Sequence, residues 1–320
     1  MPIAKSYVGG SLLSYLMVIK YIDHLTIYRQ LQMFTRQKTT IEDNTVNNWF
    51  KQGCRLIAPL FGAHKRQVLS TKYLGVDETP IKVLNKPKKG TTHQGYYWVY
   101  YNTHSRRVLF KYQIGRAAEW PKETLKNYKG YLQTDGYAAY NQFDDVAGII
   151  TLNCWLHARR KFIDAQSFDN TKASKVLTQI QVLYAVEEYC LENKYTTDEI
   201  TKYRQDQAIP LLVKLHWILQ TQLLSSLLKS PLGMVLQYTL GRWDKLKVYT
   251  SKSNLRINNN LVENSIRPVV IGRKNYLFAG NHEAAQRSAM LYGLFATCKL
   301  NDVNPIQWLT YVFENIMILK

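Results

Sequence analysis

Three acidic residues stand at positions where a carboxylate could do chemistry. Asp77 interrupts the mostly apolar run Leu74-Gly-Val-Asp-Glu-Thr-Pro80, and an acidic residue inside a strand is disfavoured unless its charge is compensated or it lies at the strand end. Asp135 follows a second short strand, and Gly136 allows the chain to turn sharply after it. Glu263 lies in the first turn of an expected helix. Three carboxylates are the hard oxygen ligands that Mg²⁺ or Mn²⁺ prefers, so the pattern predicts a metal site.

Each of these residues also has an ordinary structural explanation. Asp135 by itself is typical of a turn, and Glu263 by itself is typical of a residue that interacts with a helix dipole. The strand order around the three residues is therefore what favours a shared site.

A Cys-x-x-His pair precedes a basic helix. Cys154 and His157 are followed by Arg159, Arg160 and Lys161. We expect the Cys154/His157 pair to support the site or to face DNA. Half of a zinc site is the alternative, although no second Cys or His pair follows nearby. Trp155 between them is a candidate for stacking on a base.

Further polar residues surround Glu263. Asn260 is expected to cap its helix and to support the site. Arg267, Arg273 and Lys274 follow on the same helix, where guanidinium groups could position phosphates. A solvated surface is the alternative for these three side chains.

Composition points to a nucleic-acid partner. The 320 residues include 42 Lys and Arg against 23 Asp and Glu, a formal net charge of +19, which favours polyanions through counterion release. A basic surface that binds nothing is the alternative. The four cysteines are widely spaced, so no disulfide framework is indicated and we expect a cytoplasmic protein. The apolar stretch from Leu12 to Ile19 is too short to span a bilayer, so no membrane is expected.

The elements that position these residues follow from periodicity. Apolar residues recur at helical spacing in the ranges 11–34 and 45–61. Strands are predicted at 73–83, 96–103, 107–114, 130–134 and 149–152, the first three as an antiparallel meander, with a helix at about 117–128 and another opening at Gly136. Only helical patterns occur from 157 to about 250, including a capping box at Thr196 and Glu199. Helices are predicted from about Leu261, at 284–300 and at 305–318.

Five segments in this order resemble the transposases of the insertion-sequence sixty-six family of bacteria. The resemblance covers nearly the whole chain and is carried by Val76-Asp-Glu-Thr-Pro80, Leu132-Gln-Thr-Asp-Gly-Tyr137, Cys154-Trp-Leu-His-Ala-Arg-Arg-Lys-Phe162, Asn259-Asn-Leu-Val-Glu-Asn-Ser-Ile-Arg-Pro268 and Ile271-Gly-Arg-Lys-Asn-Tyr-Leu-Phe-Ala-Gly280.

The resemblance implies an α/β fold of RNase H type. It consists of a mixed five-stranded sheet with flanking helices and an all-helical insertion domain between the second and third catalytic carboxylates. The expected parts are an N-terminal helical segment (1–66), a core in two parts (67–162 and 252–300), the insertion (163–251) and a C-terminal helix (301–320).

The resemblance also implies an activity. Asp77, Asp135 and Glu263 would form a catalytic triad that holds two Mg²⁺ or Mn²⁺ ions for DNA cleavage and strand transfer. The implied partners are transposon ends and target DNA, a second copy of the chain on DNA, and small accessory proteins of the same element.

Two departures from the family bear on activity. Relatives carry upstream modules that are not seen here, so we expect a truncated copy or one of a split pair. The family usually has Asp where this chain has Asn258, which leaves the triad intact but removes one carboxylate beside it. The alternatives are a nuclease or resolvase without strand transfer, and an inactive DNA-binding remnant that occupies transposon ends.

Overall fold

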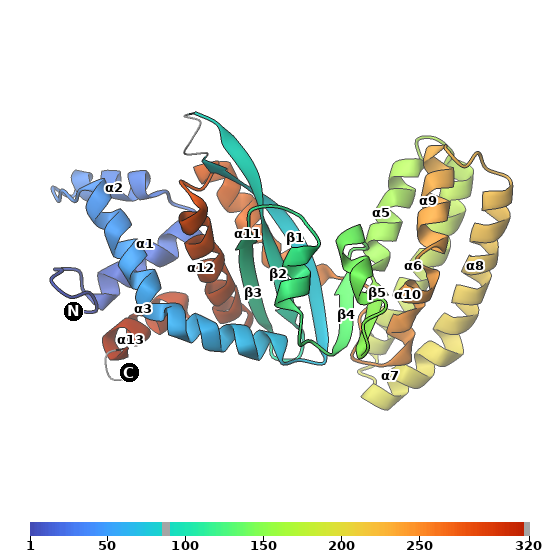
Figure 1. Ribbon diagram of the computed structural model, residues 1–320. Coiled ribbons are helices and arrows are strands. Elements are labelled where there is room, and N and C mark those ends of the chain that lie inside the picture. Colours follow the sequence, from blue (N-terminus) through green and yellow to red (C-terminus); the bar gives the residue numbers. More distant parts are fainter. Residues whose placement is uncertain (85–89, 317–320) are drawn as a thin grey trace. The chain divides into compact units, whose positions relative to one another are not determined.

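The chain folds into two compact units. The computed structural model describes residues 1–84 and 90–316. The first unit comprises Met1–Tyr128 and Leu261–Lys320, and the second comprises Lys129–Asn260. The sheet contains five strands in the order β3-β2-β1-β4-β5 (Figure 1). The predicted α/β class with a mixed five-stranded sheet is therefore confirmed, and it agrees with an RNase H-like fold.

The first unit holds the antiparallel meander that the sequence predicts. Its strands are β1 (Tyr73–Leu84), β2 (Thr92–Asn102) and β3 (Arg107–Gln113). Asp77 of β1 faces Val99 of β2, and Tyr97 of β2 faces Tyr112 of β3. Both neighbours of β2 are thus hydrogen-bonded strands, and the backbone around Asp77 is fixed by a regular ladder.

Seven helices belong mainly to the first unit in its described part. They are α1 (Gly10–Tyr21), α2 (Ile27–Arg36), α3 (Asp43–Leu69), α4 (Glu119–Thr124), α11 (Asn260–Tyr276), α12 (His282–Leu300) and α13 (Pro305–Asn315). α12 packs closely on the sheet (Figure 1). The packing is tightest at Gly293, where an added Cβ would lie 3.0 Å from the carbonyl oxygen of Val108. The last part of the predicted C-terminal helix, 317–320, lies outside the described residues.

Two helix predictions in this unit are wrong in their extent. The run predicted from 11 to 34 is two helices, because His24 adopts a left-handed conformation with φ of 59° that a right-handed helix excludes. Thr26 then caps the second helix by accepting a hydrogen bond from the backbone N–H of Arg29. The helix expected at 117–128 is limited to the six residues of α4.

The second unit contains two parallel strands followed by helices. The strands are β4 (Gly130–Thr134) and β5 (Ile149–Asn153). The helices are η1 (Ala138–Phe143), α5 (Trp155–Ala165), α6 (Asn170–Glu192), α7 (Thr197–Tyr203), η2 (Arg204–Ala208), α8 (Ile209–Leu224), α9 (Pro231–Leu240), α10 (Trp243–Lys247) and η3 (Val248–Ser251). The predicted capping box at Thr196 and Glu199 is present. The helix predicted to open at Gly136 is the short 3₁₀ turn η1.

Strand β2 carries the aromatic residues into the interior. Tyr97, Trp98, Tyr100 and Tyr101 are each 1% exposed, so these rings pack in the core. No helix in the described part of the chain is long and apolar enough to cross a membrane.

Candidate metal centre

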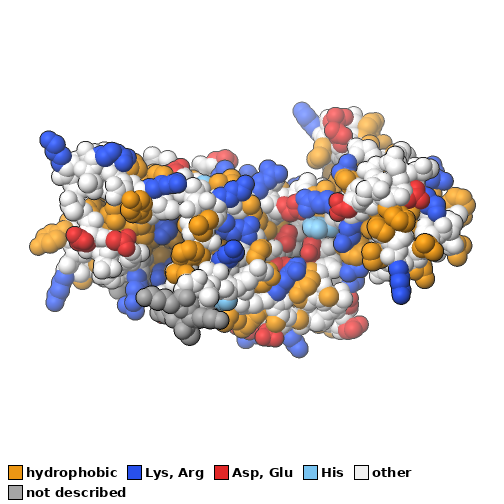
Figure 2. Space-filling model, turned by 90° about the horizontal axis from the view of Figure 1, so that it is seen from above, with side chains coloured by type: hydrophobic (Ala, Val, Ile, Leu, Met, Phe, Trp, Pro, Cys, Tyr) orange, Lys and Arg blue, Asp and Glu red, His pale blue; other side chains and the backbone are white. Residues whose placement is uncertain are grey.

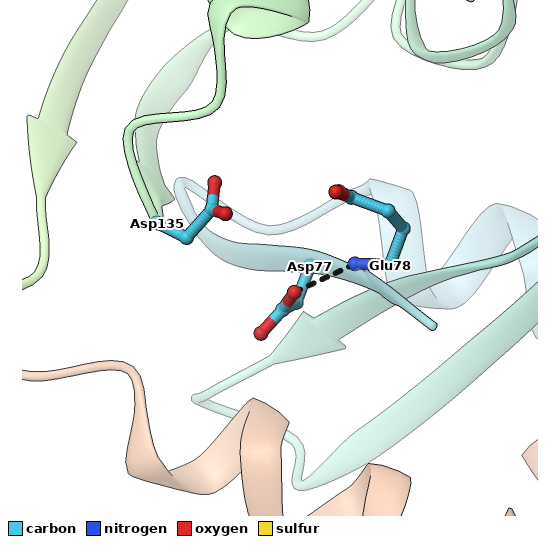
Figure 3. Close-up of side chains that lie close together, drawn as sticks. All are labelled: Asp77, Glu78 and Asp135. Carbon is cyan, nitrogen blue, oxygen red and sulfur yellow. Dashed lines mark hydrogen bonds between the residues drawn. The ribbon is translucent and has the colours of Figure 1, made fainter. Parts of the chain in front are cut away.

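Asp77 lies within β1, where the ladder fixes its position. Its side chain is half-buried, and its Oδ1 accepts a hydrogen bond from the backbone N–H of Glu78 at 2.7 Å (Figure 3). The hydrogen bond and the ladder together hold the Asp77 carboxylate in one position on a rigid strand, as a metal ligand requires.

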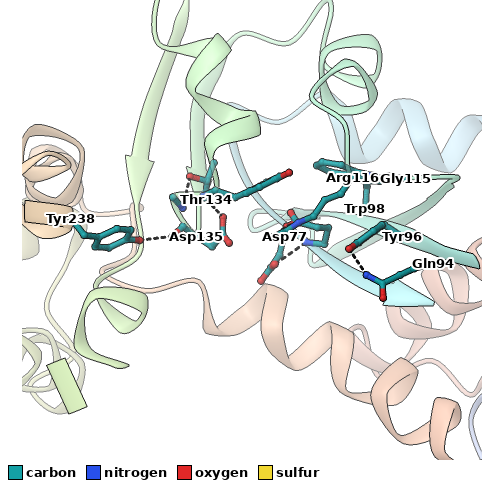
Figure 4. A network of polar contacts seen from close by, with 12 residues as sticks. Asp77, Gln94, Tyr96, Trp98, Gly115, Arg116, Thr134, Asp135 and Tyr238 are labelled. Atoms are coloured by element: carbon teal, nitrogen blue, oxygen red, sulfur yellow. Dashed lines mark hydrogen bonds and ion pairs between the residues drawn. The ribbon is translucent and has the colours of Figure 1, made fainter. Parts of the chain in front are cut away.

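Glu78, the next residue, is a further acidic side chain that the sequence analysis did not single out. Its side chain is 2% exposed and forms an ion pair with Arg116, whose Nε lies 2.8 Å from Glu78 Oε1. Arg116 also lies over the ring of Tyr96 at 5.9 Å, and Trp98 donates to the carbonyl of Gly115 beside it at 3.4 Å (Figure 4). The guanidinium of Arg116 compensates the buried charge of Glu78. Because the two residues are 38 positions apart in the sequence, this pairing cannot be recognised from the sequence.

Asp135 follows directly after β4 in the second unit. Its Oδ1 accepts a hydrogen bond from the backbone N–H of Tyr137 at 2.8 Å. Tyr238 of α9 donates to the backbone carbonyl of Asp135 at 3.0 Å (Figure 4), and Arg242 donates to the carbonyl of Gly136 at 2.9 Å. Burial raises the pKa of Tyr238, so its phenol remains a donor at neutral pH. The end of α9 therefore holds the Asp135 turn in place.

Gly136 confirms the sharp turn predicted after Asp135. Its φ is +88°, a conformation that favours glycine. A Cβ at this position would also lie 2.8 Å from both Arg242 Nε and Tyr238 Oη. Conformation and space both require glycine here, because the two side chains that hold the turn occupy the position of a Cβ.

Among the described residues, Asp77 and Glu78 of the first unit and Asp135 of the second are acidic side chains that could each offer an oxygen ligand to a metal ion (Figure 3). Their donors are all carboxylate oxygens, which suit Mg²⁺ or Mn²⁺ better than zinc. Arg116 already offsets the charge of Glu78, so Asp77 and Asp135 are the two whose charge fits an ion.

Glu263 is not a member of this acidic group. It lies in the first turn of α11 and is half-buried. The segment after α11 is tied to β1, since the backbone N–H of Leu84 donates to Ala279 at 2.9 Å and that of Ala279 donates to Lys82 at 2.8 Å. The far end of the helix is therefore fixed to the strand that carries Asp77.

The basic residues predicted to contact DNA occupy two helices. On α5, Arg159 is half-buried, whereas Arg160 and Lys161 are exposed, and the Lys161 ammonium lies 4.7 Å from the ring of Tyr238. Arg159 also lines a cleft of about 650 Å³ within the second unit.

On α11, Arg267 and Lys274 are exposed. Arg273 is half-buried and donates to the backbone carbonyl of Pro80 on β1. Lys and Arg side chains are spread over the visible face of the molecule (Figure 2).

Cys154 and His157 lie at the start of α5, where Cys154 is the N-cap residue. Cys154 is buried, and its Sγ accepts a hydrogen bond from the backbone N–H of Asn259 at 3.2 Å. This bond joins the start of α5 to the segment that leads into α11. Neither residue belongs to a group of three possible metal ligands in the described part of the chain, so nothing in the structure supports the zinc alternative.

Two smaller expectations, one for Trp155 on α5 and one for Asn260 on α11, are wrong. Trp155 is fully buried and donates to the carbonyl of Leu246 at 2.9 Å, so it has no free face on which a base could stack. Helix α11 begins at Asn260, which makes this residue the first of the helix rather than its cap. Asn258 instead accepts a hydrogen bond from the backbone N–H of Asn260 at 3.1 Å.

Comparison with known proteins shows relatives over most of the chain. The uncharacterized proteins y4qI, y4hP and y4jD of Sinorhizobium fredii are 27%, 26% and 25% identical to it over 95%, 98% and 96% of its length. The chain covers 59%, 60% and 62% of these relatives, so it spans about three fifths of their length.

Family models match in two successive stretches. The IS66 C-terminal element matches residues 293–318, and the model described as Transposase IS66 family matches residues 5–287. Because that match covers most of the chain and includes Asp77, Asp135 and Glu263, the chain belongs to the IS66 family of transposases.

Proposed function

We propose that this chain is a metal-dependent DNA transposase that cleaves the ends of an insertion sequence and joins them to target DNA. The observation that carries the proposal is the family match over residues 5–287, and the carboxylates of Asp77 and Asp135, which could offer oxygen ligands to a metal ion, support it. Because the chain spans about three fifths of its relatives' length, the activity of the whole protein is part of the proposal.

In this proposal Asp77, Asp135 and Glu263 hold two Mg²⁺ or Mn²⁺ ions. Two such ions, when bound, activate the attacking water or 3′-hydroxyl and stabilise the leaving oxygen of the phosphodiester. The chain's own contribution is positioning. Asp77 is held by the β1 ladder, and Asp135 is held by Tyr238 through its backbone carbonyl. Glu263 enters from the first turn of α11, where the helix N-terminus favours its negative charge.

The proposed partner is DNA, which the excess of basic residues favours. Four exposed cations on α5 and α11 could contact phosphates, namely Arg160, Lys161, Arg267 and Lys274. Such contacts fix the register of a duplex on the protein without reading its sequence. A second copy of the chain on paired ends, small accessory proteins and action on DNA in the bacterial cytoplasm belong to the same proposal.

The test is cleavage of DNA that carries both ends of the element encoding the chain. We expect cleavage that requires Mg²⁺ or Mn²⁺, and we expect Asp77→Asn to abolish it while binding in a gel shift stays within twofold. Asparagine keeps the shape of the side chain and an acceptor for the Glu78 N–H but removes the charge. Asp145→Asn, at an exposed position, is the matched control and should cleave normally. Wild-type cleavage by Asp77→Asn would contradict the proposal.

The products separate the transposase from the two alternatives. Joined products are expected if the protein transfers strands. Free 3′-hydroxyl ends without any joined product identify a nuclease or resolvase. DNA that is shifted but never cut identifies a binding protein that occupies transposon ends, and either of these last outcomes would overturn the proposal.

A further inference from the structure

Two histidines and a tyrosine meet on one face of the sheet in the first unit, away from the carboxylates. His93 belongs to β2, Tyr112 to β3, and His282 is the first residue of α12. Tyr112 Oη lies 2.7 Å from His282 Nδ1 and 3.4 Å from His93 Nε2. The centroids of the two imidazole rings are 4.7 Å apart. Three donor atoms from three different elements therefore converge.

The distances from Tyr112 Oη to the two imidazole nitrogens suit a single metal ion. Zinc binds imidazole nitrogen at about 2.0–2.1 Å, so two ligands of one tetrahedral or octahedral ion lie roughly 3.0–3.4 Å apart by geometry. The observed 2.7 Å and 3.4 Å differ from this range by a few tenths of an ångström at most. Small rotations of the Tyr112 and His282 side chains would therefore accommodate an ion.

The surrounding backbone makes room for this arrangement. His93, Gly95 and Tyr97 are alternate residues of β2 and so lie on one face, which α12 covers through a 2.6 Å hydrogen bond between Tyr97 and Ser288. A Cβ on Gly95 would lie 2.6 Å from the ring of Tyr112 and 2.7 Å from its Oη. The absence of a side chain at Gly95 is what lets Tyr112 lie across β2 and reach both histidines.

Access from solvent and local charge also bear on metal binding. His282 is exposed, which leaves a path for an ion from solvent. The positive end of the α12 dipole opposes a cation here, so we expect moderate rather than tight binding.

We propose that His93, Tyr112 and His282 bind one divalent transition-metal ion of the zinc type, with water in the remaining position. Two imidazoles and a phenol oxygen suit Zn²⁺, Cu²⁺ or Ni²⁺, whereas Mg²⁺ prefers oxygen ligands alone. The ion would join β2, β3 and the start of α12. It would thereby stabilise the first unit, and it is chemically distinct from ions at the carboxylates.

The proposal is tested by calorimetric titration of Zn²⁺ into the full chain carrying Asp77→Asn, in millimolar Mg²⁺, so that the carboxylates compete little for zinc. We expect one zinc per chain, and at least tenfold weaker binding after His93→Gln or His282→Gln. Tyr112→Phe keeps the ring and should weaken binding less. His104→Gln, at an exposed position in the same unit, is the control and should bind as well as its parent.

Thermal unfolding provides a second readout that needs no DNA. Zn²⁺ should raise the Tm of the parent and of His104→Gln, because an ion that binds only the folded state stabilises it. It should leave the Tm of His93→Gln unchanged, while metal-free samples show that each variant is folded. No zinc binding by the parent, or equal binding by the His93 and His282 variants, would overturn the site and leave the proposed transposase activity unaffected.

Discussion

Arg204 is a buried arginine on which the helical part of the second unit depends. It begins the π-helical turn η2, and its side chain is 4% exposed. Its Nη2 lies 2.6 Å from Glu187 Oε2 of α6. The same guanidinium donates to the backbone carbonyls of Tyr249 at 3.0 Å, Lys252 at 2.6 Å and Leu255 at 3.0 Å. One side chain therefore fixes residues 249–255, the segment that leads towards α11.

Arg204→Met should lower the free energy of unfolding by about 3 kcal/mol. Methionine fills much of the same space, but it leaves the Glu187 carboxylate and four backbone carbonyls, that of Ser253 included, without this donor. Removing one partner of a buried ion pair costs about 3–5 kcal/mol. Glu187 is 17% exposed, so water can partly solvate it, which places the expected cost at the lower end. Arg204→Lys keeps the charge but not the fork of donors, and should cost about 1–2 kcal/mol.

Urea unfolding and hydrogen exchange by mass spectrometry measure this effect together. Because the chain has two units, a single unfolding transition is not assumed, and local exchange is the more direct measurement. Peptides covering 249–255 should exchange faster in Arg204→Met, whereas peptides from α12 should not change. Lys202→Met, exposed on the preceding helix, is the control and should leave exchange in both regions as in the wild type.

A small effect would refute the reasoning. If Arg204→Met costs less than about 1 kcal/mol and residues 249–255 remain protected, water or other donors must replace the guanidinium at no net cost. The bonds seen around Arg204 would then contribute little to the path of the segment.

Three further predictions concern a glycine, a lysine and the cysteines. Gly136→Ala should lower stability by about 1–3 kcal/mol, because its φ of +88° is left-handed and the new Cβ would lie 2.8 Å from Arg242 Nε; an unchanged Tm would argue against this. Burial lowers the pKa of Lys20 from 10.5 to about 8, so the unfolded chain binds this proton more readily and stability rises with pH between these values. Lys20→Met should therefore stabilise the protein at pH 7 by about 1–3 kcal/mol, and in urea unfolding the gain should largely disappear by pH 10.5; an equal gain at both pH values would contradict the assignment. The four cysteines are buried, and burial raises the pKa of Cys54 to about 12. A thiol reagent at pH 8 should therefore label none of the four rapidly until urea is added. Fast labelling of the native protein would disprove their burial.

Strand β2 shows where local sequence patterns stop predicting the fold. The pattern predicts a strand from Tyr96, but β2 begins at Thr92. His93, Gln94 and Gly95 have little intrinsic preference for a strand. They are extended because they pair with residues 81–83 of β1, and this pairing is a tertiary interaction. The same four-residue extension brings His93 to Tyr112 and creates the proposed zinc site.

The sequence by itself determined the positions of the five strands, the sharp turn after Asp135 and the family, because periodicity and motifs are carried by neighbouring residues. Only the tertiary structure decided which side chains compensate or support the acidic residues. Arg116 pairs with Glu78 across 38 residues, and Tyr238 holds Asp135 across 103. It also decided that Trp155 is buried rather than available for stacking. Such contacts leave no pattern in a single sequence, since they depend on how distant elements pack.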